Sequence, residues 1–361
     1  MRMDETERRI PDQPWPRVGL FVLIAVVIAT AGWEMYWRSN YFNSGEYVNS
    51  NGLWAIQRRA ASEQAHPTVI IGSSRIFFDV NLDVWERVTG DRPIQLALEG
   101  TGPRPFLHDL AEDATFEGVV IVGYTPPLVF LDAFDLRLDA IDYYKTESPS
   151  EFIGQRLSMM LEARLAFLDG SNTPLFNILK NIPLESRDGV NPPHMSPRKL
   201  MTTGADRSTK MWSRVEQDTT YRKLARDIWV FLIEGLPKPP PDAPPFDPTP
   251  VFESVKTDVD KIRARGGDVV FVRPPSMAIW RDLENGGFPR ERFWDPLLEY
   301  TNTGGVHFED NSALQGLELP EWSHLSASEA EKYTEALAPL VLKALETREG
   351  VKDPSPGGSA K

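Results

Sequence analysis

The chain has no cysteine in its 361 residues. Disulfides, thiolate metal ligands and cysteine nucleophiles are therefore excluded, although this absence does not fix the compartment in which the protein works. Basic residues are in the minority, since the formal net charge is −13. They are also scattered along the chain, with no stripe that would mark a groove for nucleic acid. The sequence therefore predicts no nucleic-acid partner.

Familiar cofactor and metal motifs are missing as well. The stretch GTGPRP at 100–105 departs from the dinucleotide-binding fingerprint, and no phosphate-binding loop follows the first strand-like run. Neither His194 nor His307 has a second ligand at a spacing typical of metal sites, and His66 and His108 are likewise interpreted as structural. The sequence therefore predicts neither a cofactor nor a metal.

Residues 18–33 contain no charged side chain, and aromatic residues follow them. This apolar segment predicts a transmembrane signal anchor over 18–37. Four arginines precede this segment, whereas only Arg38 lies in the twenty residues after it. The positive-inside rule then places the N-terminus (1–17) in the cytoplasm and the main domain outside, in the periplasm. Two alternatives are a signal peptide cleaved at the A-x-A site at 29–31 and a core helix of a cytosolic protein.

Short apolar runs rich in β-branched residues recur along the chain and are separated by helix-like stretches. They lie at 68–74, 93–98, 119–125, 268–275 and 305–310. Continuous rather than alternating hydrophobicity is typical of parallel strands that are covered on both faces. We therefore predict an α/β fold, a flavodoxin-like three-layer sandwich with a central parallel sheet.

The alternation of strands and helices is interrupted in the middle of the chain. Residues 128–235 predict a mostly helical insertion or cap without a comparable strand, and the eight prolines of 236–250 predict an extended linker. The α/β domain is thus expected to be split into two halves. The other segments are a connector and helix at 38–65, the first half of the domain at 66–127, its second half at 251–346 and a disordered tail at 347–361.

Three features lie where sites form in open α/β sheets, at strand ends and the loops beside them. The Gly-Ser-Ser stretch 72–74 follows the first strand, and its glycine permits a sharp turn that would present a serine; a plain turn is the alternative. Gly100 follows the second strand and could offer a backbone N–H to an oxyanion or simply turn the chain. Glu321 and His324 lie three residues apart before the last helix. They could supply a serine with a base and an orienting acid, or His324 could be an exposed loop histidine.

In combination these features resemble the SGNH/GDSL hydrolase superfamily over residues 66–126 and 251–346. The Gly-Ser-Ser form with an N-terminal anchor is similar to the membrane-attached branch, which includes envelope acyl-transfer proteins. The resemblance implies that Ser74 is the nucleophile, that His324 is its base and that Glu321 orients the imidazole. Glu321 stands where the family has an aspartate.

The same resemblance implies an oxyanion hole formed by Gly100 and the backbone of Ser74. The family adds an Asn side chain after the third strand, but this chain has Thr125 followed by two prolines there. Thr125 is either a substitute donor or part of a turn, and the loss of one oxyanion donor typically slows turnover ~10²–10³-fold. Arg273, at the end of the fourth strand, is a candidate substrate-binding residue; a solvated strand-end arginine is the alternative.

These residues predict a membrane-anchored, extracytoplasmic serine esterase or O-acyltransferase that acts on acyl esters of a cell-envelope glycan through an acyl-serine intermediate. Arg75 and Asp79, which flank the serine, are expected to hold its loop by hydrogen bonding. Because the Asn is missing, and because Ser73 and Glu321 replace family aspartates, a catalytically inactive envelope binding or assembly protein is the alternative. A cytosolic flavodoxin-like binding protein is a third interpretation. The sequence does not distinguish hydrolysis from transfer, nor does it identify the acyl donor, the acceptor or partners in an envelope complex.

Overall fold

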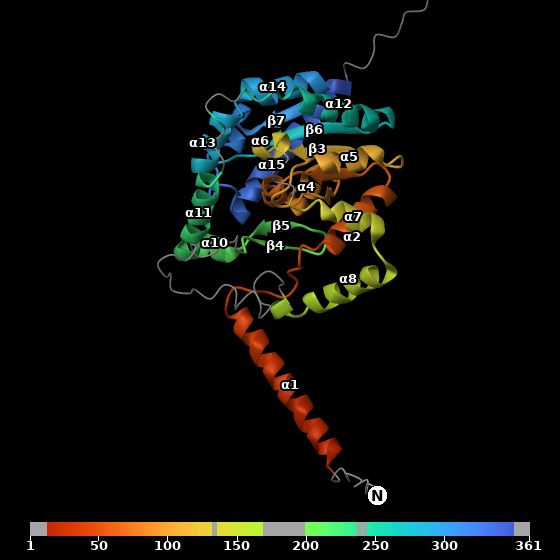
Figure 1. Cartoon of the computed structure of the whole chain (residues 1–361), viewed down its shortest axis with the longest axis vertical. Helices are drawn as coiled ribbons and strands as arrows, with labels where there is room; N and C mark the ends of the chain where they lie inside the picture. The colour runs from red at the N-terminus through yellow and green to blue at the C-terminus, as the bar shows by residue number, and fades with distance from the viewer. Residues whose placement is uncertain (1–12, 132–135, 169–198, 237–239, 241–243, 350–361) are drawn as a thin grey trace, which may run out of the picture.

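The structure, a computed structural model, describes residues 13–131, 136–168, 199–236, 240 and 244–349. Figure 1 shows a domain built around one sheet, with a long helix projecting from one end. The first twelve residues, much of the predicted linker and most of the predicted tail lie outside the described residues.

Five strands form one parallel sheet in the order β2-β1-β3-β6-β7 (Figure 1). Each of the five apolar runs contributes one strand, so the predicted α/β fold with a central parallel sheet is confirmed. The strands end earlier than predicted, because the last residues of several runs belong to the loops beyond the sheet. Their bounds are β1 Thr68–Ile71, β2 Ile94–Gln95, β3 Val119–Gly123, β6 Asp268–Arg273 and β7 Gly304–His307.

The sheet joins parts of the chain that are far apart in sequence. Val119 of β3 lies opposite Asp268 of β6, and Val122 lies opposite Phe271. Alternate residues of a strand point to opposite faces, so each strand feeds two hydrophobic cores, which explains its continuous apolar character. The residues on one face are Val69, Ile71, Val120, Val122, Val269 and Phe271, and those on the other are Ile70, Ile121, Val270 and Val272.

Helices cover both faces of the sheet (Figure 1). The first face is covered by α2 (Asn51–Glu63), α5 (Arg104–Glu112), α12 (Thr249–Ala264) and α14 (Arg290–Thr301). The second is covered by α3 (Ser74–Asp79), α4 (Leu82–Thr89) and α15 (Ala327–Glu349). A further helix, α13 (Ala278–Gly287), and two short 3-10 turns, η3 (Phe308–Asp310) and η4 (Ser312–Leu314), complete the second half of the chain.

Several helices begin at side chains that satisfy the free backbone N–H groups of a first turn. The Ser50 side chain accepts from Leu53 N at the start of α2, and the Asn81 side chain accepts from Val84 N at the start of α4. Helix α4 ends at Gly90, which adopts a left-handed conformation. Local sequence therefore fixes these boundaries.

The described part of the inserted region is mostly helical, and it also contains a two-stranded ribbon that the sequence did not predict. Strands β4 (Met201–Thr203) and β5 (Thr209–Met211) pair in an antiparallel ribbon. Each is three residues long and partly polar, so neither shows the continuous apolar run that marks the central strands. Among the described residues its helical elements are α6 (Pro126–Phe130), α7 (Asp139–Thr146), α8 (Pro149–Glu162), η2 (Ala166–Leu168), α10 (Ser213–Gln217) and α11 (Thr219–Glu234).

Helix α1 (Trp15–Arg38) projects away from the domain (Figure 1) and contains the predicted segment 18–37. It is long and apolar enough to cross a membrane, and its apolar window has no buried residue. Its 24 residues extend over about 36 Å at the rise of an α-helix, compared with about 30 Å for the hydrocarbon core of a bilayer. At its C-terminal end, the Glu34 carboxylate accepts hydrogen bonds from Ala166 N (2.9 Å) and Phe167 N (3.1 Å), which attach the helix to the domain.

Candidate active site

Ser74 is the first residue of α3, directly beyond the carboxyl end of β1. The turn between them depends on Gly72, which has φ +143°, a value that side chains rarely allow. A Cβ at this position would lie 2.8 Å from Ile76 Cγ2 and 3.0 Å from Gly123 Cα. Only glycine fits without displacing these neighbours. As the first residue of a helix, Ser74 has a backbone N–H without an acceptor inside that helix.

His324 lies between Ser74 and Glu321. Its Nε2 is 2.8 Å from Ser74 Oγ, and its Nδ1 is 2.8 Å from Glu321 Oε1. Ser74 and His324 are 250 residues apart in sequence and are brought together because β1 and the loop before α15 meet at one edge of the sheet. With Nδ1–H donating to the carboxylate, Nε2 is free to accept the Ser74 hydroxyl proton. His324 and Glu321 are buried, and Ser74 is half-buried.

The Glu321 carboxylate is completely buried and receives several donors. Besides His324 Nδ1, it accepts from the backbone N–H of His324 at 2.7 Å and from the indole N–H of Trp229. Burial acts to raise the pKa of Glu321, but the neighbouring His324 and these hydrogen bonds outweigh it and lower the pKa below its usual value. The acid is therefore held ionised beside the imidazole.

Helix α11 of the inserted region supplies the Trp229 contact. One turn earlier, Arg226 Nε donates to the carbonyl of Pro320 at 2.8 Å, just before Glu321. The inserted region thus fixes the loop that carries the acid. Sequence reasoning missed Trp229, because a tryptophan in an amphipathic helix has the same pattern whether it packs in a core or orients a carboxylate.

Arg75 and Asp79 tie α3 to the loop of His324. Asp79 Oδ1 accepts from Leu325 N at 2.9 Å, and Arg75 Nε lies 3.3 Å from Ser323 Oγ. Both side chains are buried. Burial raises the pKa of Asp79 well above its usual value, only partly opposed by the Leu325 N–H and the Arg75 charge. The expected hydrogen bonding is present, and it holds the serine helix against the histidine loop.

Gly100 and Thr125 follow the strands on either side of β1. Residues beyond β2 continue alongside the serine turn, since Leu98 N donates to Gly72 O at 2.9 Å. Gly100 lies two residues further on, with φ +65°. The Thr125 hydroxyl is buried and lies 2.7 Å from Ser73 Oγ, at the N-terminus of α6. These contacts match the interpretation of Thr125 as part of a turn better than that of a free oxyanion donor.

The alternative interpretation of Arg273, a solvated strand-end arginine, is wrong. Arg273 is 2% exposed and forms an ion pair with Glu284 of α13 at 2.5 Å. Glu284 also forms an ion pair with Arg75, the residue after Ser74. The two arginines outweigh the effect of burial and lower the pKa of Glu284. The sequence did not reveal Glu284 as the ion-pair partner of Arg273, because no element was predicted for the segment that contains α13.

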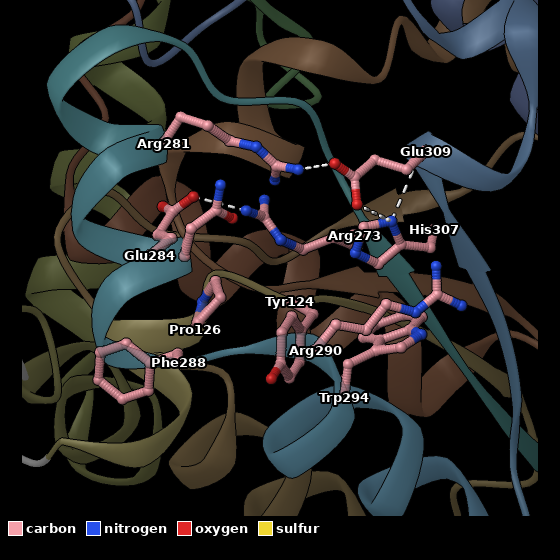
Figure 2. Close-up of a pocket in the computed structure, with 11 residues that line it drawn as sticks. Tyr124, Pro126, Arg273, Arg281, Glu284, Phe288, Arg290, Trp294, His307 and Glu309 are labelled. Atoms are coloured by element: carbon pink, nitrogen blue, oxygen red, sulfur yellow. Dashed lines mark hydrogen bonds and ion pairs between the residues drawn. The ribbon is translucent and has the colours of Figure 1, made fainter.

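Arg273 also lines a small cavity of about 30 Å³ (Figure 2), whose lining includes none of Ser74, His324 and Glu321. Its arginines are neutralised within the protein, because Arg281 pairs with Glu309 and Arg290 pairs with Asp295 and Asp310. Burial, with the nearby charges of Arg273 and Arg290, lowers the pKa of His307 to about 3, so the imidazole is neutral. A cavity of this size accommodates a few water molecules or one small polar group.

One cluster of metal-ligating side chains lies away from these residues. Ligand atoms of His108, Glu112 and Asp258 lie within 4.8 Å of one another, although His108 was interpreted as structural. The carboxylate of Glu112 is paired with Lys261, and His108 Nδ1 is 3.0 Å from Asp258 Oδ1. The three side chains thus have partners within the protein. Sequence spacing missed the cluster because Asp258 comes from a distant helix.

No protein-family model and no curated protein matches the sequence. A functional assignment therefore rests on the motifs and on the geometry around Ser74, His324 and Glu321.

Proposed function

We propose that the chain is a serine esterase or O-acyltransferase of the SGNH type, with a flavodoxin-like domain. The observation that carries the proposal is the continuous hydrogen-bonded series from Ser74 Oγ through His324 to Glu321, with 2.8 Å at each step. A serine needs a base within hydrogen-bond reach, and the base needs an acceptor on its other nitrogen. Both requirements are met in a buried environment.

In the proposed reaction, Ser74 Oγ attacks the carbonyl carbon of an acyl ester while His324 Nε2 takes the hydroxyl proton. The ionised Glu321 stabilises the resulting imidazolium and keeps its orientation. His324 then gives the proton to the leaving alcohol, which leaves an acyl group on Ser74. Water or a sugar hydroxyl attacks this intermediate, His324 takes its proton, and Ser74 recovers the proton as the product leaves.

The oxyanion hole in this proposal has two backbone donors, Ser74 N and Gly100 N. The family Asn is missing, and the hydroxyl of Thr125 is engaged by Ser73. We therefore expect turnover ~10²–10³-fold below that of an enzyme with a third donor. The same observation favours the second candidate function, a catalytically inactive envelope binding or assembly protein.

The substrate class and location follow from the anchor and the resemblance. Helix α1 would anchor the chain in the membrane, and the arginines before it would keep the N-terminus in the cytoplasm. The main domain would then lie in the periplasm, where acyl esters of a cell-envelope glycan are substrates of the similar proteins. Arg273 is buried and its guanidinium is held by Glu284, so in this proposal it could bind only a small polar group that enters the small cavity.

Labelling with a fluorophosphonate tests the proposal on the full chain in detergent. We expect covalent labelling of Ser74. Ser74→Ala should abolish this labelling, and His324→Ala should slow the labelling rate by at least ~10³-fold, as in other triads. Ser328→Ala is a matched control, because this serine is exposed at the start of α15, and it should label like the unmodified chain. A folded protein that does not label would instead support the inactive binding protein.

A further inference from the structure

Helix α8 presents four of its large apolar side chains to solvent, while two others, Phe152 and Met159, are half-buried on the side that also carries Gln155 and Glu162. Ile153, Leu157, Met160 and Leu161 are 54–58% exposed and recur at helical spacing along one side. We call these four residues the α8 apolar face. Soluble domains rarely expose a contiguous set of large apolar side chains, and such a set marks an interaction surface.

The opposite side of α8 is held on the domain by polar contacts. Gln155 Oε1 accepts from Ser50 Oγ at 2.8 Å, and the buried Glu162 accepts from Val48 N at 2.9 Å. A surface helix usually turns its large apolar side chains toward the domain, whereas four of those of α8 face solvent. Because the inner contacts fix the rotation of the helix, its apolar face cannot turn inward without breaking them.

The end of α8 is joined to the end of the anchor helix. Glu34 of α1 accepts from the backbone of Ala166 and Phe167 just beyond α8, and Arg38 donates to Arg164 O at 3.1 Å. Figure 1 shows α8 at the end of the domain from which α1 projects. The α8 apolar face therefore lies at the level where α1 would leave a bilayer.

We propose that the α8 apolar face rests in the surface of the bilayer that α1 spans, as a second membrane contact. Interfacial helices bury such faces roughly 5–10 Å into the boundary between headgroups and acyl chains. Arg156 of α8 and Arg164, two residues beyond its end, are exposed and can meet anionic headgroups. The proposal rests on α1 as the anchor and is independent of the chemistry of Ser74.

A single introduced cysteine tests this, since the chain has none of its own. An environment-sensitive fluorophore is attached to the cysteine of Leu157→Cys. The labelled full chain is then inserted into nanodiscs, one copy per disc, whose lipids have acyl chains brominated near the headgroup. Emission should fall by roughly half relative to non-brominated lipid, because the label would lie at the depth of interfacial side chains. The matched control is Lys256→Cys on α12, an exposed site far from α1 in Figure 1, where emission should not change.

Equal emission from the Leu157 label in both lipids, in a folded and monodisperse sample, would overturn the proposal. Ile153→Cys repeats the measurement one turn away and guards against a local effect of the first substitution. Hydrolase activity is not used in the test, so failure here is distinct from failure of the proposed function.

Discussion

The buried Glu321 carboxylate depends on donors from two parts of the chain. Its own loop supplies the backbone N–H groups of Ser323 and His324, and the inserted region supplies the indole N–H of Trp229. Burying an ionised carboxylate away from water costs free energy unless such donors replace its hydration. The inserted region therefore contributes directly to the charge state of the candidate site.

Replacing Trp229 by phenylalanine removes that donor and keeps most of the packing. Hydrogen bonds to charged groups are worth about 1.5–3 kcal/mol, so we expect Trp229→Phe to slow fluorophosphonate labelling of Ser74 by roughly tenfold or more. The substitution also removes an interaction that lowers the pKa of Glu321. The acid limb of the pH profile of the labelling rate should therefore move to higher pH.

Trp280→Phe is the matched control for this measurement. Trp280 lies against Trp229, with ring centroids 5.5 Å apart, but within the described part of the chain its indole nitrogen has no hydrogen-bond partner. It should label like the unmodified chain. Equal rates for Trp229→Phe and Trp280→Phe would show that the hydrogen bond to Glu321 does not support reactivity.

At the scale of single residues, the sequence could predict the residues that belong to a motif, but not the side chains that contact them. Ser74, Glu321 and His324 stand in a recognisable order, and the fold brings them within hydrogen-bond distance. The burial of Arg273 depends on Glu284, which lies on α13, a helix that was not predicted. Contacts between side chains on unrelated elements leave no periodicity in the sequence.

At the scale of elements, the link between α3 and the histidine loop depends on Asp79. Its Oδ1 accepts from Leu325 N, whereas Oδ2 has no hydrogen-bond partner among the described residues. Burial raises the pKa of Asp79, so the folded protein keeps a proton that the unfolded chain releases above its ordinary pKa of about 3.9. The stability that this proton contributes is present below the unfolded pKa and is lost as pH rises through the folded pKa.

Asp79→Asn removes this pH dependence and keeps an oxygen that can accept from Leu325 N. We expect the variant to gain stability relative to the unmodified chain as pH rises, by up to about 1.4 kcal/mol per pH unit within the titration window. Urea unfolding of both proteins at pH 5 and pH 8 measures the difference. A difference in unfolding free energy that is the same at both pH values would contradict the prediction.

The central strands could be predicted because a parallel sheet covered on both faces demands continuous apolar runs. Strands β4 and β5 could not be predicted, because each has only three residues and neither is a continuous buried apolar run. The orientation of α8 on the domain could not be predicted from the sequence either. Residues 151–168 have a helical pattern, but the side that faces the domain is set by Ser50 and Val48 on another segment.

For the whole molecule, the proposed topology puts the two ends of the chain on opposite sides of the membrane. In protease-treated spheroplasts, a tag at the C-terminus should be digested and a tag at the N-terminus protected. Permeabilised cells, in which both tags are digested, control for protease resistance. Protection of both tags in intact spheroplasts would place the domain in the cytoplasm and contradict the assignment.

The pairing of β3 with β6 has a consequence for how the chain folds. Strand β3 is central in the finished sheet, yet β6 follows it only after residues 124–267. Closing a loop of that length costs about 4 kcal/mol in chain entropy, and pairing between distant segments is slow. Until β6 is available, β3 is a bare edge that can pair with other chains. We therefore expect folding to wait for the second half of the chain, and the first half to need protection from aggregation until β6 pairs with β3.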